Sequence, residues 1–117
     1  MPAEPDNLLA RWLKGVLESC VLGILRSGPA YGYDIAGRIA EAGFARPKGG
    51  TLYPILSRLE TEGLVEATWI EGDGGPSRKY YELTPAGLDA VDAVATRWPA
   101  FATSVETLLS THPARRN

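Results

Sequence analysis

Two strand-like runs separated by a cluster of turn-forming residues constrain the fold of this chain more than any other feature. The runs are residues 64–71 (LVEATWIE) and 78–83 (RKYYEL), and the six residues between them read GDGGPS. β-Branched and aromatic residues favour strands, whereas Gly, Asp, Pro and Ser favour turns. We therefore predict one β-hairpin with a six-residue loop in a chain whose other patterns are helical.

Three helical patterns precede the hairpin. Apolar residues recur at spacings of three and four over residues 9–25, and the pattern stops at RSGPAYGY, residues 26–33, which we interpret as a turn. A second, narrower apolar face spans residues 35–40 and is closed by Gly43. The third helix lies within GGTLYPILSRLETEGLV, residues 49–65, where Gly63 is the stop.

The third helix contains a proline near its start. Proline lacks an N–H group and clashes with the preceding turn, so a helix interior tolerates it poorly, whereas the first turn accepts it. Pro54 therefore predicts a helix that begins near Gly50 or Thr51. Tyr53 directly precedes the proline, which disfavours helical backbone angles at Tyr53.

A long helix follows the hairpin. Thr84 and Pro85 suit the N-cap and the first helical position. Apolar residues then alternate at spacings of three and four over three heptads. This wide stripe needs a partner surface, and a second copy of the same helix is the simplest one. The stripe comprises Leu88, Val91, Val94, Ala95, Trp98, Phe101, Ala102, Val105, Leu108 and Leu109.

Composition narrows the class of protein. The 117 residues suffice for one domain, and 44% hydrophobic and 22% charged residues are ordinary globular usage. The N-terminus lacks a signal pattern, and no apolar run reaches the roughly 18 residues of a membrane span, so we expect a cytoplasmic protein without a membrane partner. A lone Cys20 and a lone His112 provide no metal cluster or catalytic set. We expect no enzyme activity, no metal and no cofactor.

Four sequence blocks together resemble PadR-like transcriptional regulators. They are LKGVLESCVLGIL, YGYDIAGRI, GGTLYPILSRLETEGLV and GGPSRKYYELTPAG, and the resemblance runs over about residues 8–109. It implies a mainly α fold with a small β-hairpin wing. Residues 1–83 would form a winged helix-turn-helix DNA-binding domain that includes the N-terminal helix, and residues 84–117 a C-terminal dimerisation helix and tail. The resemblance implies that the chain is a homodimeric transcriptional regulator that binds operator double-stranded DNA in a sequence-specific manner.

The resemblance puts Thr51, Tyr53 and Pro54 at the exposed start of the recognition helix. Between Arg38 and Arg58 the chain has four basic residues and one acidic residue, although the formal charge of the whole chain is −2. A local basic surface is what phosphate contacts require. Two structural alternatives stay open, because Tyr53 can merely cover the helix start and Arg58 can pair with Glu62. The candidate DNA-binding residues are Tyr33, Lys48, Gly50, Thr51, Tyr53, Pro54, Arg58, Arg78 and Lys79.

The resemblance also implies a dimer interface between the first and last helices. Its candidate residues are Leu9, Leu13, Val16, Val91, Val94, Trp98, Phe101, Val105 and Leu108. Multidrug-sensing relatives are similar in having a tryptophan at the position of Trp98, so Trp98 and Trp12 are candidates for binding a small aromatic or hydrophobic effector that releases a repressor. The alternative is that Trp98 only packs the dimer core. An alternative function is a protein-interaction module that keeps the winged scaffold without operator recognition.

Overall fold

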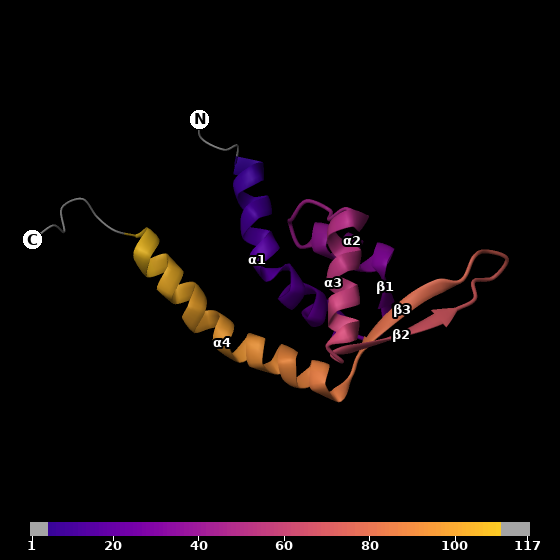
Figure 1. Cartoon of the computed structure of the whole chain (residues 1–117). Helices are drawn as coiled ribbons and strands as arrows, with labels where there is room; N and C mark the ends of the chain where they lie inside the picture. Colours follow the sequence, from indigo (N-terminus) through magenta and orange to yellow (C-terminus); the bar gives the residue numbers. More distant parts are fainter. Residues whose placement is uncertain (1–4, 111–117) are drawn as a thin grey trace, which may run out of the picture.

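The computed structural model describes residues 5–110, and describes side chains from residue 11 onward. The mainly α fold with a β-hairpin wing is confirmed (Figure 1). The side chain of Leu9 and all of His112 lie outside the described part. The elements are α1 (Pro5–Leu25), β1 (Ala30–Tyr31), α2 (Gly32–Glu41), α3 (Gly49–Thr61), β2 (Val65–Ile70), β3 (Arg78–Leu83) and α4 (Pro85–Leu109).

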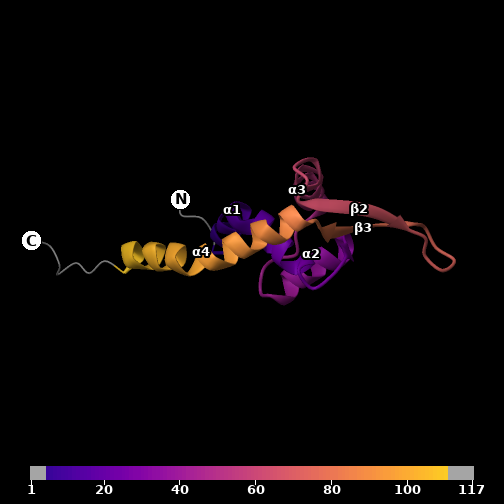
Figure 2. The same ribbon diagram turned by 90° about the horizontal axis from the view of Figure 1, so that it is seen from below.

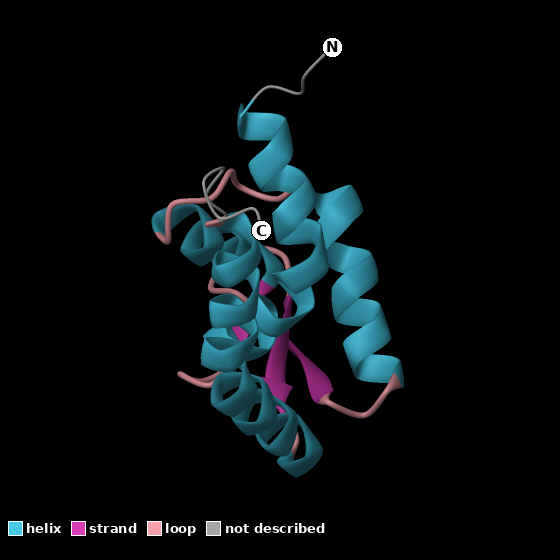
Figure 3. Ribbon diagram, turned by 90° about the vertical axis from the view of Figure 1, so that its left-hand side faces the viewer, coloured by secondary structure: helices cyan, strands magenta, loops and turns pink. Residues whose placement is uncertain are grey.

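The molecule has a helical body with two projections. α1, α2 and α3 form the body, the β2–β3 hairpin extends from one side, and α4 extends from the other (Figure 1). Figure 2 shows the hairpin and α4 pointing in opposite directions in the perpendicular view, and in Figure 3 the strands lie behind the helices. None of the helices in the described part of the chain combines the length and the apolar content that crossing a membrane requires.

The core joins the three body helices to the base of the sheet. α1 contributes the i, i+4 pair Leu17 and Val21, and α2 contributes Ile35 and Ile39 at the same spacing. One face of α3 closes the core, and its opposite face is left exposed. The largest fully buried side chains are Leu17, Val21, Ile35, Ile39, Leu52, Leu56, Leu59 and Val65.

The segment predicted as a turn contains a strand. β1 pairs with β3, with Ala30 opposite Tyr81 and Tyr31 opposite Tyr80, so the sheet has three antiparallel strands in the order β1-β3-β2. A two-residue strand is too short to show any alternation in the sequence. The tyrosine rings of Tyr31 and Tyr80 lie 5.3 Å apart, whereas Tyr81 is buried at 3% exposure.

The predicted start of α3 was wrong by one or two residues, because the helix begins at Gly49 with Lys48 as N-cap. Pro54 therefore lies in the second turn, beyond the first N–H groups that need no helical partner. In a regular α-helix the carbonyl of Gly50 would accept a hydrogen bond from the N–H of residue 54, but proline has no N–H to donate. Gly50 is exposed, so water solvates this carbonyl and the cost of the proline is reduced.

α4 begins as predicted. The Thr84 hydroxyl accepts a hydrogen bond from the Gly87 N–H at 3.0 Å and donates one to the Gly63 carbonyl at 2.6 Å. The cap thus fixes the helix start to the end of the α3–β2 connection. Farther along, α4 contains Pro99 and bends (Figure 1), which agrees with a proline that removes one backbone hydrogen bond.

Candidate nucleic-acid interface

The exposed face of α3 carries polar side chains along its length. Leu52, Ile55, Leu56 and Leu59 point into the core, and the 3.6-residue period then directs Thr51, Tyr53, Pro54, Ser57 and Arg58 outward. At the helix start the Lys48 side chain makes no capping hydrogen bond. The first N–H groups of α3 and the Lys48 ammonium therefore share one exposed end, where a helix attracts anions.

Tyr53 connects the start of α3 to the start of α2. A Cβ atom added to Gly32 would lie 2.5 Å from the Tyr53 hydroxyl oxygen, so the tyrosine ring packs directly over the Gly32 backbone. Tyr53 is nevertheless 49% exposed. Both sequence interpretations thus describe part of its position, because the ring covers a helix start while one side stays open to solvent.

A hollow of about 450 Å³ separates α3 from the wing. Tyr53 and Ser57 line it from α3, while Trp69 lines it from β2 at 66% exposure. Ser77, Arg78 and Lys79 line it from the start of β3 and the residue before it. Hydroxyl groups and cations are the groups that contact the sugar-phosphate backbone of nucleic acids.

The two basic residues of the wing have partners within the chain. The Arg78 guanidinium lies 4.8 Å from the centre of the Tyr31 ring, and the Lys79 ammonium lies 3.4 Å from a Glu60 carboxylate oxygen of α3. These contacts hold Arg78 against β1 and Lys79 against α3, although the wing tip itself is exposed. The structure therefore brings the predicted residues Tyr53, Arg78 and Lys79 to one surface.

Tyr33 forms a second exposed position next to this surface. Its ring is 69% exposed, and the Arg46 guanidinium lies 4.3 Å from the ring centre. Arg46 also donates a hydrogen bond to the Tyr33 carbonyl at 2.8 Å. The α2–α3 loop is thereby tied to the start of α2.

Arg58 pairs with a residue that the sequence pattern did not indicate. Its Nε lies 3.4 Å from a carboxylate oxygen of Glu18 on α1, so Arg58 has a structural partner, although this partner is Glu18 and not the Glu62 of the alternative interpretation. Both side chains are exposed, and an exposed ion pair contributes at most about 1 kcal/mol. Arg58 therefore gives up this contact at little cost.

Several surface residues escaped the sequence prediction. Tyr31, Ser57, Trp69 and Ser77 line the hollow, and Arg46 supports Tyr33 from the α2–α3 loop. Ser57 could have been predicted from its outward position on α3, and Trp69 from the alternation of side chains along its strand. Nothing local marked Tyr31, because its partner Arg78 is distant in sequence.

A second hollow lies between α1 and α4. Its volume is about 470 Å³, and its walls include Val16 and Cys20 from α1 and Val94, Trp98 and Pro99 from α4. The Trp98 ring is 46% exposed and lies 5.4 Å from the ring of Phe101. The lining of this hollow does not include Trp12, which is 63% exposed elsewhere on α1, so the two predicted effector residues do not share a hollow within one chain.

Two predicted dimer-interface residues belong to the core of their own chain. Leu13 is 9% exposed and Val91 is 4% exposed, and both pack in the main hydrophobic cluster. They anchor α1 and α4 and offer little surface to a partner. Val16 and Val94 are half-buried, while Phe101, Val105 and Leu108 remain exposed.

Two titratable side chains are perturbed by burial. Burial raises the pKa of the Cys20 thiol, which keeps it protonated and weakly nucleophilic at neutral pH. Burial also raises the pKa of the Tyr81 phenol, although the nearby Lys79 ammonium partly opposes the rise. Within residues 11–110, whose side chains the structure describes, no three His, Cys, Asp or Glu side chains cluster as metal ligands would.

A winged helix-turn-helix body with a polar recognition-helix face defines the class of transcriptional regulators that bind DNA. The sequence pattern of the Transcriptional regulator PadR-like family matches residues 21–93. The chain belongs to this family, whose members are transcriptional regulators rather than enzymes.

Solved structures agree with this assignment. The chain is similar to a PadR family transcriptional regulator from Eggerthella lenta, at 35% identity and a TM-score of 0.79, over 91% of this chain and 92% of that one. It is also similar to a PadR-like transcriptional regulator from Bacillus cereus, at 36% identity and a TM-score of 0.76, over 87% and 99% of the two chains.

A curated relative is longer than this chain. The negative transcriptional regulator PadR of Bacillus subtilis is 37% identical over 75 residues, which cover 62% of this chain and 41% of that protein. The present chain therefore matches less than half of the length of that relative.

Proposed function

We propose that this chain is a homodimeric repressor that binds a specific operator and releases it when a small aromatic or hydrophobic effector binds. Residues 1–83 form the DNA-binding unit, and residues 84–117 form the dimerisation helix and tail. The observation that carries the DNA-binding part is the polar surface that α3 and the wing share around Tyr53, Arg78 and Lys79.

The DNA-binding geometry follows from this surface. α3 enters the major groove with the Thr51 and Tyr53 end foremost, and the sugar-phosphate backbone passes through the hollow beside the wing. Lys48, Arg78 and Lys79 neutralise phosphates there. Gly50, Thr51 and Pro54 allow the start of α3 to approach the DNA closely. Tyr33, with Arg46 stacked on its ring, contacts the adjoining DNA backbone. When DNA binds, Arg58 leaves the carboxylate of Glu18 and pairs with a DNA phosphate.

The dimer is supported by the apolar surface that α4 leaves uncovered. This 25-residue helix is roughly 37 Å long, yet its only buried residues are Gly87 and Val91 in its first half. In its second half Phe101 is 58% exposed and Leu108 is 74% exposed. Figure 1 shows this half of α4 diverging from α1, and a partner helix would cover the exposed apolar residues there.

The effector site is supported by the hollow at Trp98. Its walls are mainly apolar, and Pro99 of α4 is one of its lining residues. The flat ring of Trp98 offers a surface on which a ligand ring can stack, and this contact favours planar aromatic ligands. In the dimer, the two hollows meet near the symmetry axis. Trp12 of one subunit lines the hollow of the other subunit in this arrangement. The repressor role is supported by the name of the Bacillus subtilis relative, a negative transcriptional regulator.

Selection of duplexes from a random library tests this function. We expect the protein to enrich one sequence with approximate inverted symmetry, whose half-sites lie about 34 Å apart. Binding to this duplex, and to DNA upstream of the chain's own gene as a natural candidate, is then measured by gel shift at several salt concentrations. Failure to enrich any sequence, with no salt-sensitive shift, would favour the alternative of a protein-interaction module.

A further inference from the structure

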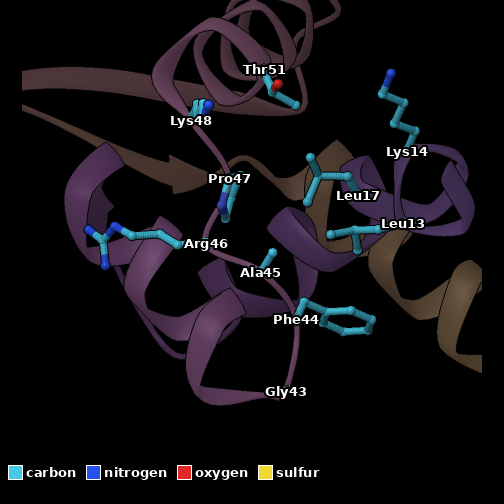
Figure 4. Close-up of a pocket in the computed structure, with 10 residues that line it drawn as sticks. All are labelled: Leu13, Lys14, Leu17, Gly43, Phe44, Ala45, Arg46, Pro47, Lys48 and Thr51. Atoms are coloured by element: carbon cyan, nitrogen blue, oxygen red, sulfur yellow. The ribbon is translucent and has the colours of Figure 1, made fainter. Parts of the chain in front are cut away.

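The loop between α2 and α3 is loosely packed against α1. It runs from Gly43 to Lys48, which is the N-cap of α3. A hollow of about 330 Å³ lies along one side of it, and the walls include Leu13 and Leu17 of α1 and Phe44 of the loop (Figure 4). Because a hollow lies there, packing against α1 does not hold the loop closely.

The backbone of this loop also does little to fix it. Within residues 11–110, no backbone N–H or carbonyl group of residues 45–47 takes part in a hydrogen bond. The flanking bonds run from the Phe44 N–H to the Ile39 carbonyl at 3.4 Å and from the Thr51 N–H to the Lys48 carbonyl at 2.9 Å. In this part of the chain, the hydrogen bond that joins residues 45–47 to the body is donated by the Arg46 side chain.

The Arg46 guanidinium lies across the first turns of α2. Figure 4 shows this side chain directed to the opposite side of the loop from Phe44. The guanidinium carbon lies 4.3 Å from the centre of the Tyr33 ring, and Nη2 donates to the Tyr33 carbonyl at 2.8 Å. A Cβ atom added to Gly37 would lie 3.2 Å from Nη1. An aromatic face, a carbonyl and a bare glycine thus surround a planar group, and a lysine ammonium does not match this geometry.

We infer that Arg46 is a positioning residue, which ties the α2–α3 loop to α2 and thereby holds Lys48 and the start of α3 in the orientation that DNA binding requires. Arg46 acts through Tyr33 and the loop and contacts no phosphate itself. As an exposed cation two residues before Lys48, it would otherwise count as one more phosphate contact. The inference rests on the proposed function, in which α3 enters the major groove.

The contribution of Arg46 to DNA binding is conformational. A backbone residue that becomes ordered only on binding costs free energy, whereas a loop that is already fixed in the free protein does not incur this cost. Loss of the Arg46 contacts lets residues 45–48 fluctuate. If one residue must then be ordered on binding, operator affinity falls roughly tenfold. The number of phosphate contacts stays the same, and so does the dependence of affinity on salt.

Operator affinity is measured by fluorescence anisotropy with the selected duplex at several salt concentrations. We expect Arg46→Ala and Arg46→Lys each to weaken binding roughly tenfold and to keep the wild-type slope of log affinity against log salt. Lys48→Ala is the matched comparison, and it should reduce the slope by about 0.9 because it removes a phosphate contact. Full affinity in Arg46→Lys, together with a slope reduced by about 0.9 in Arg46→Ala, would make Arg46 a phosphate contact and overturn the inference.

Gly37→Leu displaces the Arg46 guanidinium without removing a charge. The larger side chain takes the space beside Nη1, and leucine is a good helix former within α2. This variant should weaken operator binding as Arg46→Ala does, and the double variant should be no weaker than either single variant. Additive losses in the double variant would show that the leucine acts independently of Arg46, and would contradict the role of this contact.

Backbone order parameters from NMR relaxation of the DNA-free protein test the positioning role directly. In Arg46→Ala and Gly37→Leu we expect the values at Ala45 and Lys48 to fall from about 0.85 toward 0.6, with wild-type values in the helical body and an unchanged Tm. Lys48→Ala should keep the wild-type value at Ala45.

Wild-type order parameters in Arg46→Ala would refute the positioning role. A loss of order throughout the body would also refute it, because Arg46 would then serve only the stability of the fold. Failure of the wild type to bind any duplex would instead refute the proposed function, and the order parameters would still decide whether Arg46 fixes the loop.

Discussion

Replacing Gly87 with alanine should destabilise the protein although alanine is the better helix former. A Cβ atom at this position would lie 2.0 Å from the Leu64 carbonyl oxygen and 3.1 Å from a Leu83 methyl carbon. The oxygen belongs to the backbone and also accepts the Thr84 N–H at 3.1 Å. The start of α4 must therefore move away from the α3–β2 connection, and the hydrogen bond that joins them is lost.

The size of the effect follows from three opposing contributions. Overpacking of a close contact costs about 1–3 kcal/mol, and loss of the Thr84 backbone hydrogen bond adds about 1 kcal/mol. Alanine in place of glycine returns up to about 1 kcal/mol through helix propensity. We expect a net loss of about 2 kcal/mol in the free energy of unfolding, which lowers the Tm of a domain of this size by about 10 °C.

Gly15→Ala provides a control with the opposite sign. Gly15 lies within α1, is exposed, and has no atom within 4 Å of an added Cβ. Helix propensity then acts alone and should raise stability by up to about 1 kcal/mol. Urea unfolding followed by circular dichroism, at one fixed protein concentration, measures both variants. Wild-type stability in Gly87→Ala, or an equal loss in Gly15→Ala, would refute the steric reasoning.

Three further predictions concern the proposed function. Lys79→Ala should weaken operator binding and reduce the slope of log affinity against log salt by about 0.9, whereas Trp69→Ala should weaken binding with no slope change; identical slopes for wild type and Lys79→Ala would remove Lys79 from the phosphate contacts. Leu108→Glu should dissociate the dimer in sedimentation because it buries an unpaired charge costing several kcal/mol, while the exposed change Glu106→Gln should not; a dimer that persists in Leu108→Glu would place the interface elsewhere. Planar aromatic compounds should quench tryptophan fluorescence in the wild type but not in Trp98→Phe, and equal quenching in both would leave Trp98 with a packing role.

Much of the candidate DNA surface was predictable because it follows from local periodicity. Once α3 was recognised, its apolar positions required Thr51, Tyr53 and Ser57 to face outward. The partners of the basic residues were not predictable in this way. Arg58 contacts Glu18 forty residues away, and Lys79 of β3 contacts Glu60 of α3, so both ion pairs depend on how separate elements pack.

The sequence by itself determined the order of the elements, the wing and the start of α4. Helical spacing, the GDGGPS turn and the Thr84 cap each act over a few residues, and such local preferences are readable without knowledge of the fold. Only the tertiary structure decided that β1 exists and that Leu13 and Val91 serve the chain's own core. These features arise where segments distant in sequence meet, and their formation depends on packing of the whole chain rather than on the pattern of any one segment.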